Sequence, residues 1–382
     1  MIHFNNAGAS LMPRSVSQAV NGYLTTEEET GGYETQAAYA NELAAFYTNT
    51  AQLLNTQPAN IAFTYSSTDA YARALSSIPF RAGDVILTTN DDYISNQTAF
   101  LSLQKRFGIR LVRANDKPGG GVDADHFIQL ARQLRPVLLA VTHVPTNAGR
   151  IQPVEAFGPV AREIGAWYLV DACQSVGQMP VDAVGIGADF LCATGRKFLR
   201  GPRGTGLLYV SDRVLESELE PLFIDMRGAD WATTDTYTPQ PTARRFEQWE
   251  SAPALQLGLA EAIRYANEVG LSYIQNRNAV LRERLQAGLA DLPGLRLLDT
   301  GDRLASLLLF TLPDHPTPAP VMAALKQQAI NFSMSYTNFA LIDWERKGVE
   351  WAVRFSPHYY NTDEEVDTVV GVMREFLTAS RL

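Results

Sequence analysis

The sequence predicts an α/β fold in which an open sheet carries a ligand site along one edge. Three apolar strands are expected at residues 167–170, 189–193 and 207–210. The first stops at Asp171, the second runs into Thr194 to Lys197, and a glycine-rich turn over residues 201–206 feeds the third. Ligands of open α/β sheets bind outside the carboxyl ends of strands. We therefore expect Asp171 and Lys197 to face the same crevice.

Length and composition favour a globular chain with two domains, or one large domain and a smaller lobe. The chain has 382 residues, of which 46% are hydrophobic, more than one simple core requires. A net charge of −9 argues against nucleic acid as a partner, because nucleic acid requires basic patches. The longest apolar runs fall short of 18 residues, so the sequence predicts no membrane span.

The expected location is cytoplasmic. The start MIHFNNAGAS has neither the basic region nor the apolar core of a secretory signal. Two cysteines, Cys173 and Cys192, do not make a disulfide framework. The ending Ser380-Arg381-Leu382 resembles the peroxisomal S-K-L address, which gives that compartment as the minor alternative.

Helices and short strands alternate through the N-terminal half. Apolar spacing and turn residues predict helices at about 13–25, 36–54, 101–106, 125–134 and 153–164. Apolar runs predict strands at 61–63, 84–88, 109–113 and 137–144. The run Thr64 to Thr68 ends a strand and begins a helix, and the N–H groups of a helix N-terminus form a ready phosphate site.

The C-terminal half is less regular at first. Residues 221–242 read as a long active-site loop. Two helices, at 254–268 and 272–289, lead to a second lobe with strands at 294–299, 304–312, 331–335 and 350–355 and helices at 318–329 and up to 379. Thr362 and Glu365 form a capping box for the last helix. Strand alternation buries Trp351, Val353 and Phe355 and places Arg354 on the other face.

The pair Asp171 and Lys197 is what a pyridoxal phosphate (PLP) enzyme needs. A lysine binds the cofactor aldehyde, and an acid keeps the pyridine nitrogen protonated. Thr194 and Arg196 place a neutral and a charged phosphate ligand beside the lysine. Singly, each residue fits a strand-end acid or a solvated lysine, whereas the combined run is much more specific.

This run resembles the class V aminotransferase family, whose cofactor motif reads D-x-x-Q, D-F, S-x-H-K and G-P-x-G-x-G. Thr194 replaces the usual serine and Arg196 the usual histidine, and both keep a donor. The likeness extends from Asn6 to Asp367. The matching positions are Asp171, Gln174, Asp189, Phe190, Lys197, Gly201, Pro202, Gly204 and Gly206.

The resemblance implies a PLP-dependent transferase of fold type I. It implies a large domain with a mixed, mostly parallel seven-stranded sheet and a smaller α+β C-terminal domain. Residues 1–15 would join the active site, 16–255 would form the large PLP-binding domain, and 256–382 the small domain. It also implies a homodimer with shared active sites. No Cys/His cluster has zinc spacing, so no metal is expected.

The resemblance also assigns cofactor-binding residues. Lys197 is the catalytic lysine, Ser67 and Thr68 reach the phosphate, and Tyr93 stacks on the pyridine ring. In the H-V-x-N-x-x-G loop Thr146 occupies the asparagine position and Asn147 is its neighbour, so either is a candidate. Ser251 lies one position beyond the threonine column of R-F-E-x-G-T, whose hydroxyl reaches the partner's cofactor. The full set is Ser67, Thr68, Tyr93, Thr146, Asn147, Asp171, Gln174, Thr194, Arg196, Lys197 and Ser251.

The predicted substrate is an α-amino acid. The segment R-F-S-P-H-Y-Y-N-T resembles the family's C-terminal segment, in which the arginine, here Arg354, holds the α-carboxylate. Asn6 and Tyr33 are further predicted substrate-binding residues.

Several reactions share these residues. The motifs most resemble the branch that contains isopenicillin N epimerase-like proteins and the ergothioneine C–S lyase, which favours β-elimination from a cysteine conjugate. Class V transamination is the alternative, and epimerisation ranks below it. A persulfide-forming cysteine desulfurase is disfavoured, because residues 333–348 contain no cysteine.

Overall fold

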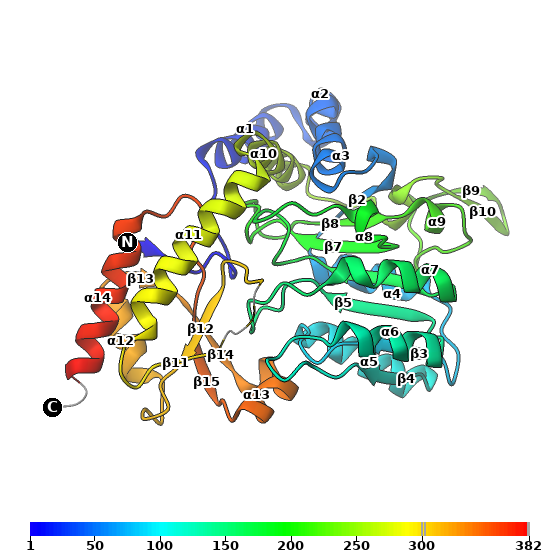
Figure 1. Cartoon of the computed structure of the whole chain (residues 1–382). Helices are drawn as coiled ribbons and strands as arrows, with labels where there is room; N and C mark the ends of the chain where they lie inside the picture. The colour runs from blue at the N-terminus through cyan, green and yellow to red at the C-terminus, as the bar shows by residue number, and fades with distance from the viewer. Residues whose placement is uncertain (299–300, 302, 380–382) are drawn as a thin grey trace.

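The computed structural model describes residues 1–298, 301 and 303–379, and its centre is a seven-stranded sheet (Figure 1). The strand order is β2-β8-β7-β6-β5-β3-β4. Strand β8 runs opposite to the other strands of this sheet, which share one direction, so the predicted mixed, mostly parallel sheet is confirmed. The strands are β2 (Ile61–Thr64), β3 (Val85–Thr88), β4 (Arg110–Arg113), β5 (Leu138–Thr142), β6 (Trp167–Asp171), β7 (Phe190–Thr194) and β8 (Gly206–Val210).

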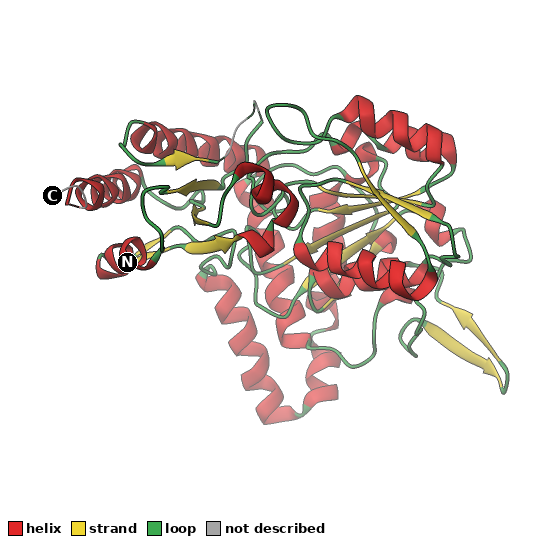
Figure 2. Ribbon diagram, turned by 90° about the horizontal axis from the view of Figure 1, so that it is seen from below, coloured by secondary structure: helices red, strands yellow, loops and turns green. Residues whose placement is uncertain are grey.

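Helices cover both faces of this sheet, as Figure 2 shows. In β5, Leu138 and Ala140 face one hydrophobic cluster while Leu139 and Val141 face another. A continuous apolar run is what a parallel strand buried on both faces requires. One face packs on α4 (Ser67–Ser77) and α5 (Ile94–Phe107), and the other on α3 (Ala40–Leu54), α6 (Ala124–Leu134), α7 (Gly158–Ile164) and α8 (Ala183–Ile186).

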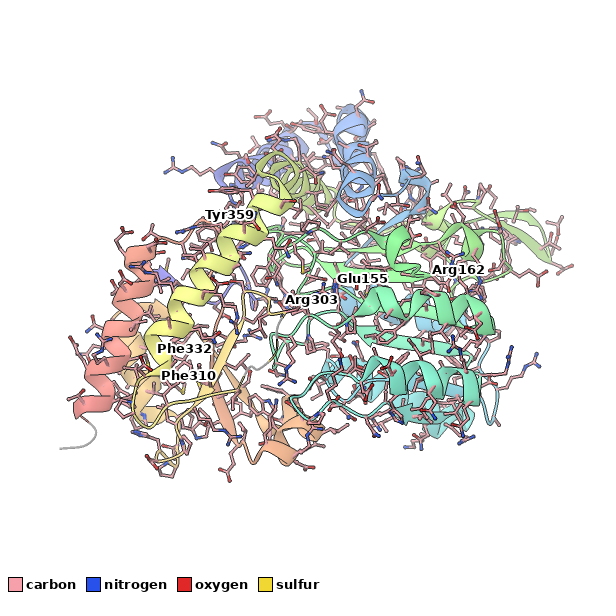
Figure 3. All side chains as sticks on the ribbon, in the orientation of Figure 1. Glu155, Arg162, Arg303, Phe310, Phe332 and Tyr359 are labelled. Carbon is pink, nitrogen blue, oxygen red and sulfur yellow. The ribbon has the colours of Figure 1, made fainter. Side chains whose placement is uncertain are left out.

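A second, antiparallel sheet lies in the C-terminal part. Its order is β11-β12-β15-β14, with β11 (Arg296–Leu297), β12 (Leu308–Thr311), β14 (Ser333–Tyr336) and β15 (Trp351–Phe355). Its core contacts α11 (Leu271–Ala290), α12 (Ala319–Gln327) and α14 (Asp363–Ala379). Phe310 and Phe332 lie in this part of the molecule (Figure 3).

The predicted alternation of β15 is confirmed. Trp351, Val353 and Phe355 belong to the core of the second sheet. Ala352, on the other face, joins the cluster of the large sheet. Arg354 shares that face, so it points toward the large sheet. The predicted capping box is also present. The Glu365 N–H donates to Thr362 Oγ1 (3.2 Å), and the Thr362 N–H donates to Glu365 Oε2 (3.1 Å).

The N-terminal segment spans both sheets. Strand β1 (Ile2–His3) pairs in parallel with β13 (Ile330–Asn331), and Asn5 bridges to Ser356. It is followed by α1 (Arg14–Thr30), α2 (Gly32–Ala38) and α3, on which α10 (Pro253–Val269) packs. The domain boundaries after residues 15 and 255 remain a prediction. They assign most of α10 to the small domain, whereas α10 packs on α1 and α3.

Several predicted elements differ in extent. The single helix expected at 36–54 is broken at Tyr39, whose ring packs on Tyr23. The helix expected at 153–164 is split into η2 (Val154–Ala156) and α7, because Pro159 occupies the first turn of α7, where no N–H donor is needed. The strand expected at 304–312 is shorter, since Leu304 bridges to Arg150 of the large-sheet part.

The expectation of an irregular loop at 221–242 is wrong for residues 229–239. They form an antiparallel hairpin, β9 (Ala229–Thr233) and β10 (Thr236–Pro239), that projects from the body (Figures 1 and 2). Its threonine and aromatic residues favour strands, and this propensity was not recognised.

Short elements complete the described chain: η1 (Pro58–Asn60), α9 (Asp212–Leu215), η3 (Ala243–Phe246), η4 (Thr337–Phe339) and α13 (Leu341–Lys347). None of the described helices combines the length and apolar character needed to cross a membrane. Asp299, the end of a predicted strand, and the ending Ser380-Arg381-Leu382 lie outside the described residues.

Candidate active site

Two adjoining cavities lie at the carboxyl ends of the large sheet's strands. The first, which we call the inner cavity, has a volume of about 530 Å³. The second, the outer cavity, has about 610 Å³ and reaches β14 and η4. They share Tyr93, Thr146, Arg196 and Lys197. The inner cavity is also lined by Ser66, Ser67, Thr68, Asn96, Thr142, Val144, Asp171, Cys173, Gln174 and Thr194.

Most of the predicted residues meet here. All predicted cofactor residues except Asn147 and Ser251 line the inner cavity. Arg354 and Asn147 line the outer one. The strand-end positions are responsible, because Asp171 closes β6 and Lys197 follows β7, its parallel neighbour.

Lys197 is an amine in a buried setting. Its side chain is only 7% exposed, and its Nζ lies 5.8 Å from the centroid of the Tyr93 ring. Burial lowers the pKa of Lys197, and the neighbouring Arg196 and Arg354 lower it further, against the opposing effect of Cys173 and Asp171. More of the Lys197 amine is therefore in its neutral form, which is the nucleophilic and basic form.

Asp171 is oriented by two donors. Asn96 Nδ2 donates to Asp171 Oδ2 (2.9 Å) and the Cys173 N–H donates to Oδ1 (2.9 Å). Asn96 Nδ2 also contacts Asp92 Oδ1 (3.0 Å), a second buried carboxylate that accepts from Thr142 Oγ1. Burial raises the pKa of Asp92, and these hydrogen bonds oppose the shift. Asn96 and Asp92 were not among the predicted site residues, although polar residues that closely follow a predicted strand are candidates for a site at the sheet edge.

The N-terminus of α4 opens into the inner cavity. Ser66 caps the helix by accepting from the Asp69 N–H (3.1 Å), which leaves Ser67 and Thr68 in its first turn beside the cavity. Across the cavity, Thr194 donates to the Thr205 carbonyl (3.1 Å), and Arg196 Nη1 donates to the Gly8 carbonyl. Helix N–H groups, hydroxyls and a guanidinium together suit a phosphate group.

Arg354 is a buried cation that has no anionic partner among the described residues. It is 6% exposed, its Nη1 donates to Thr146 Oγ1 (2.7 Å), and its Nε has no hydrogen-bond acceptor among the described residues. Burial, with a smaller contribution from Arg196, lowers the pKa of Arg354 to about 10, so the group remains charged near neutral pH. An unpaired buried charge is costly, and a ligand carboxylate would relieve that cost.

The two candidates in the 146–147 loop take different places. Thr146 lines both cavities, and its Oγ1 accepts from Gln174 Nε2 (2.7 Å) as well as from Arg354. Asn147 is turned toward the second sheet: its Nδ2 donates to the Phe339 carbonyl (2.9 Å), and its Oδ1 accepts from Ser335 (2.9 Å).

Three predicted residues lie elsewhere in this chain. Asn6 is fully buried, donates to the Ser356 carbonyl (2.7 Å) and accepts from the Tyr360 hydroxyl, while its neighbours Ala7 and Gly8 line the outer cavity. Tyr33 and Ser251 line a separate cavity of about 1,480 Å³. Their site roles remain predictions, and Ser251's role requires a partner subunit.

The individual residues of the outer wall were not predicted, although the family resemblance pointed to the segment 333–348. Ile94, Ser333, Met334, Ser335 and Phe339 line the outer cavity. Four of them belong to β14 and η4, which reach the site only because the second sheet packs against the first. No local pattern in the sequence signals that approach.

Comparison with known proteins places the chain in a family. The model of the family described as aminotransferase class-V matches residues 2–369. The chain belongs to the class V aminotransferase family. A probable cysteine desulfurase of Methanothermobacter thermautotrophicus is 29% identical over 98% of this chain and 94% of that protein.

Solved structures of other class V proteins have the same fold. The apo structure of a cysteine desulfurase from Thermococcus onnurineus superposes with a TM-score of 0.91 at 28% identity, over 99% of this chain and 95% of that one. A cystine C–S lyase in complex with cysteine persulfide gives 0.85 at 24% identity, over 98% and 97%. Fold type I is thereby confirmed, and the chain is a PLP-dependent enzyme.

The inner cavity of this class V protein fits PLP. Lys197 would bind the aldehyde carbon, and Asp171, held by Asn96 and Cys173, would accept from the pyridine N–H. The N-terminus of α4 with Thr194 and Arg196 would hold the phosphate. The unsatisfied Oε1 of Gln174 and the unpaired Arg354 Nε are polar atoms that a cofactor and its substrate can engage.

PLP attachment should require Lys197 and respond to pH. Borohydride reduction of the wild-type holoenzyme should fix PLP on the peptide that contains Lys197, as read by mass spectrometry. Because burial lowers the pKa of this amine, PLP uptake by apoprotein should accelerate with rising pH and level off with a midpoint below 10.5. Lys197→Ala should trap no PLP, whereas the exposed Lys326→Ala should behave as wild type; PLP fixed on another residue would contradict the assignment.

Arg354 should recognise a carboxylate. Wild-type enzyme should prefer an amino acid over its carboxamide, and Arg354→Gln should lose about 2–3 kcal/mol of that preference, roughly 30- to 150-fold in kcat/KM. Arg354→Lys should recover only part, since an ammonium cannot bind a carboxylate bidentately. Equal discrimination in wild type and Arg354→Gln would exclude this role.

Proposed function

We propose that this chain is a PLP-dependent C–S lyase that releases a thiol from the β carbon of a cysteine conjugate. The observation that carries the proposal is the lining of the outer cavity, between Lys197 and Arg354, which contains no cysteine among the described residues. Residues 333–348 contain none either. No thiolate is therefore available there to take sulfur from the substrate as a persulfide.

Several similar proteins are named as cysteine desulfurases, so the proposed elimination has to be distinguished from the desulfurase reaction. The thiol nearest the site is Cys173, which lines the inner cavity below the expected cofactor position. Burial raises the pKa of the Cys173 thiol to about 11, although Lys197 opposes the shift. A protonated thiol is a poor nucleophile. This supports elimination, in which sulfur leaves the substrate without attack by a protein thiol.

The residues divide the work as follows. Arg354 binds the α-carboxylate, and its bond to Thr146 fixes the direction of the guanidinium, so that the Cα–H points toward Lys197. Lys197 Nζ accepts the Cα proton. Bound PLP supplies an electron-withdrawing ring, which Asp171 keeps protonated at nitrogen.

The Cβ–S bond then breaks, its electron pair leaves with sulfur, and the proton held by Lys197 Nζ is available to make the thiol. The remaining three-carbon product, 2-aminoacrylate, takes up one water to give pyruvate and ammonia. Transamination and epimerisation would use the same residues. They would differ in where a proton returns: Lys197 would deliver it to the cofactor carbon in transamination, whereas epimerisation would need a second acid to deliver a proton to the face of Cα opposite Lys197.

The reaction is tested by incubating holoenzyme with S-substituted cysteines and with cysteine. Elimination predicts pyruvate and thiol in equal amounts, no alanine, and no need for a keto acid. Lys197→Ala should form neither product, and Cys173→Ser should still form pyruvate. Alanine with sulfane sulfur, lost in Cys173→Ser, would identify a desulfurase. Amino transfer that depends on a keto acid, without pyruvate release, would identify an aminotransferase.

We further propose that the enzyme is a homodimer in which each subunit completes the other's site. Exposed apolar side chains gather on the segment before and within the hairpin: Leu222 (66% exposed), Phe223 (86%), Met226 (67%) and Trp231 (81%). An exposed patch of this size favours protein contact. The cavity lined by Tyr33 and Ser251 lies near this segment, because it also contains Arg227 and Trp249.

Sedimentation equilibrium should give twice the chain mass of 42.0 kDa. Phe223→Asp should weaken the dimer, because a charge on a buried apolar contact is unpaired. Ser251→Ala should leave the dimer intact and lower PLP affinity. A 42.0 kDa monomer with undiminished PLP binding would contradict both parts of the proposal.

A further inference from the structure

The outer cavity carries its charges at one end only. Arg196 and Lys197 also line the inner cavity, and Arg354 is bonded to Thr146, which lines both. The residues that form the rest of the outer wall are uncharged, namely Ala7, Gly8, Ile94, Asn147, Ser333, Met334, Ser335 and Phe339. The cations therefore lie where the cofactor and the α-carboxylate bind, and not where the substrate's side chain extends.

These cations have their counter-charges once cofactor and amino acid are bound. A phosphate monoester carries about −1.5 to −2 near neutral pH, and an α-carboxylate adds one more negative charge. Together they more than match the two positive charges of Arg196 and Arg354, since Lys197 must be neutral to accept the Cα proton, while Asp171 is matched by the protonated pyridine nitrogen. A further charge on the substrate's side chain would find no partner among the described residues that line this partly enclosed cavity, and an unpaired charge there is costly.

The polar atoms of the outer wall are already engaged with one another. Asn147 uses both ends of its amide, donating to the Phe339 carbonyl (2.9 Å) and accepting from the Ser335 hydroxyl (2.9 Å). The Ser333 hydroxyl donates to the Met334 carbonyl (3.4 Å). This wall therefore offers a substituent the apolar side chains of Ile94 and Phe339, beside hydroxyl and amide groups that are already hydrogen-bonded.

Resting on the lyase function proposed above, we infer that the substrate is a cysteine conjugate whose sulfur carries an uncharged, apolar group. Ile94 and Phe339 receive that group, whereas the Met334 side chain lies opposite Val353 and packs against the core of the second sheet. Asn147 is a positioning residue, since it holds Ser335 and the Phe339 backbone in the wall without needing to touch the substrate. Conjugates with a second carboxylate or an amine on the sulfur substituent are the wrong class for this cavity.

Three conjugates of similar size test the inference: S-propyl-, S-carboxymethyl- and S-(2-aminoethyl)-L-cysteine. Wild-type holoenzyme should favour the propyl conjugate over both charged ones by about tenfold or more in kcat/KM, the size of effect expected for an unpaired charge. Phe339→Arg should raise kcat/KM for the carboxymethyl conjugate relative to the propyl one by about tenfold, because it supplies the missing partner. Phe107→Arg, the same change at an exposed position of α5 that lines neither cavity, should leave the ratio unchanged.

Binding is measured separately from turnover, by the change in the cofactor's visible spectrum as each conjugate is added. If none of the three yields pyruvate, the lyase proposal fails, and the order of the three Kd values still decides the substrate class. A charged conjugate that binds as tightly as the propyl one, or a ratio that Phe339→Arg does not move, overturns the inference. The expected Kd order, propyl tightest, supports it whichever reaction follows.

Discussion

The constraint on which the site depends is the burial of a guanidinium without a counter-ion. Arg354 is enclosed and is bonded only to uncharged groups among the described residues. Its direction follows from the hydrophobic pattern of its own strand, since Trp351, Val353 and Phe355 must fill the core of the second sheet. The intervening face of β15 is then pressed against the large sheet. The packing that stabilises one lobe thus directs a cation into the cavity that Lys197 also lines.

Much of this arrangement could be predicted from the sequence, because it follows from strand ends and periodicity. Asp171 and Lys197 close parallel neighbours, and Arg354 alternates with three core residues. What could not be predicted depends on contacts across the fold. Asn96 reaches Asp171 because α5 begins at Ile94, several residues earlier than the apolar spacing indicated.

The outer wall and the role of Asn147 were beyond prediction for a related reason. They exist only where β14 and η4 meet the loop after β5, and nothing local in either segment records the meeting. The hairpin at 229–239 is a different kind of miss. Its strand propensity was present in the sequence, but turn residues and a lack of apolar periodicity favoured a loop.

The scaffold is compatible with several reactions, and the fold does not choose among them. Lys197, Asp171 and Arg354 would serve any enzyme that removes the α proton of an amino acid. The reaction is then set by what surrounds the β carbon. Here the wall of the outer cavity is uncharged beyond the residues shared with the inner cavity and Arg354, and none of the described residues that line it is a cysteine. In the proposed reaction, groups that are missing near the sulfur therefore matter as much as groups that are present.

The start of the chain has a consequence for how the enzyme is made. Asn6 is bonded to the backbone of Ser356, and Arg196 is bonded to the carbonyl of Gly8. Ala7 and Gly8, which line the outer cavity, are therefore held by residues from two distant parts of the chain, one of them synthesised 350 positions after Asn6. On the ribosome, the strands that precede Asp171 and Lys197 emerge long before β15 and its Arg354. The outer cavity can therefore form only when synthesis of the chain is nearly finished.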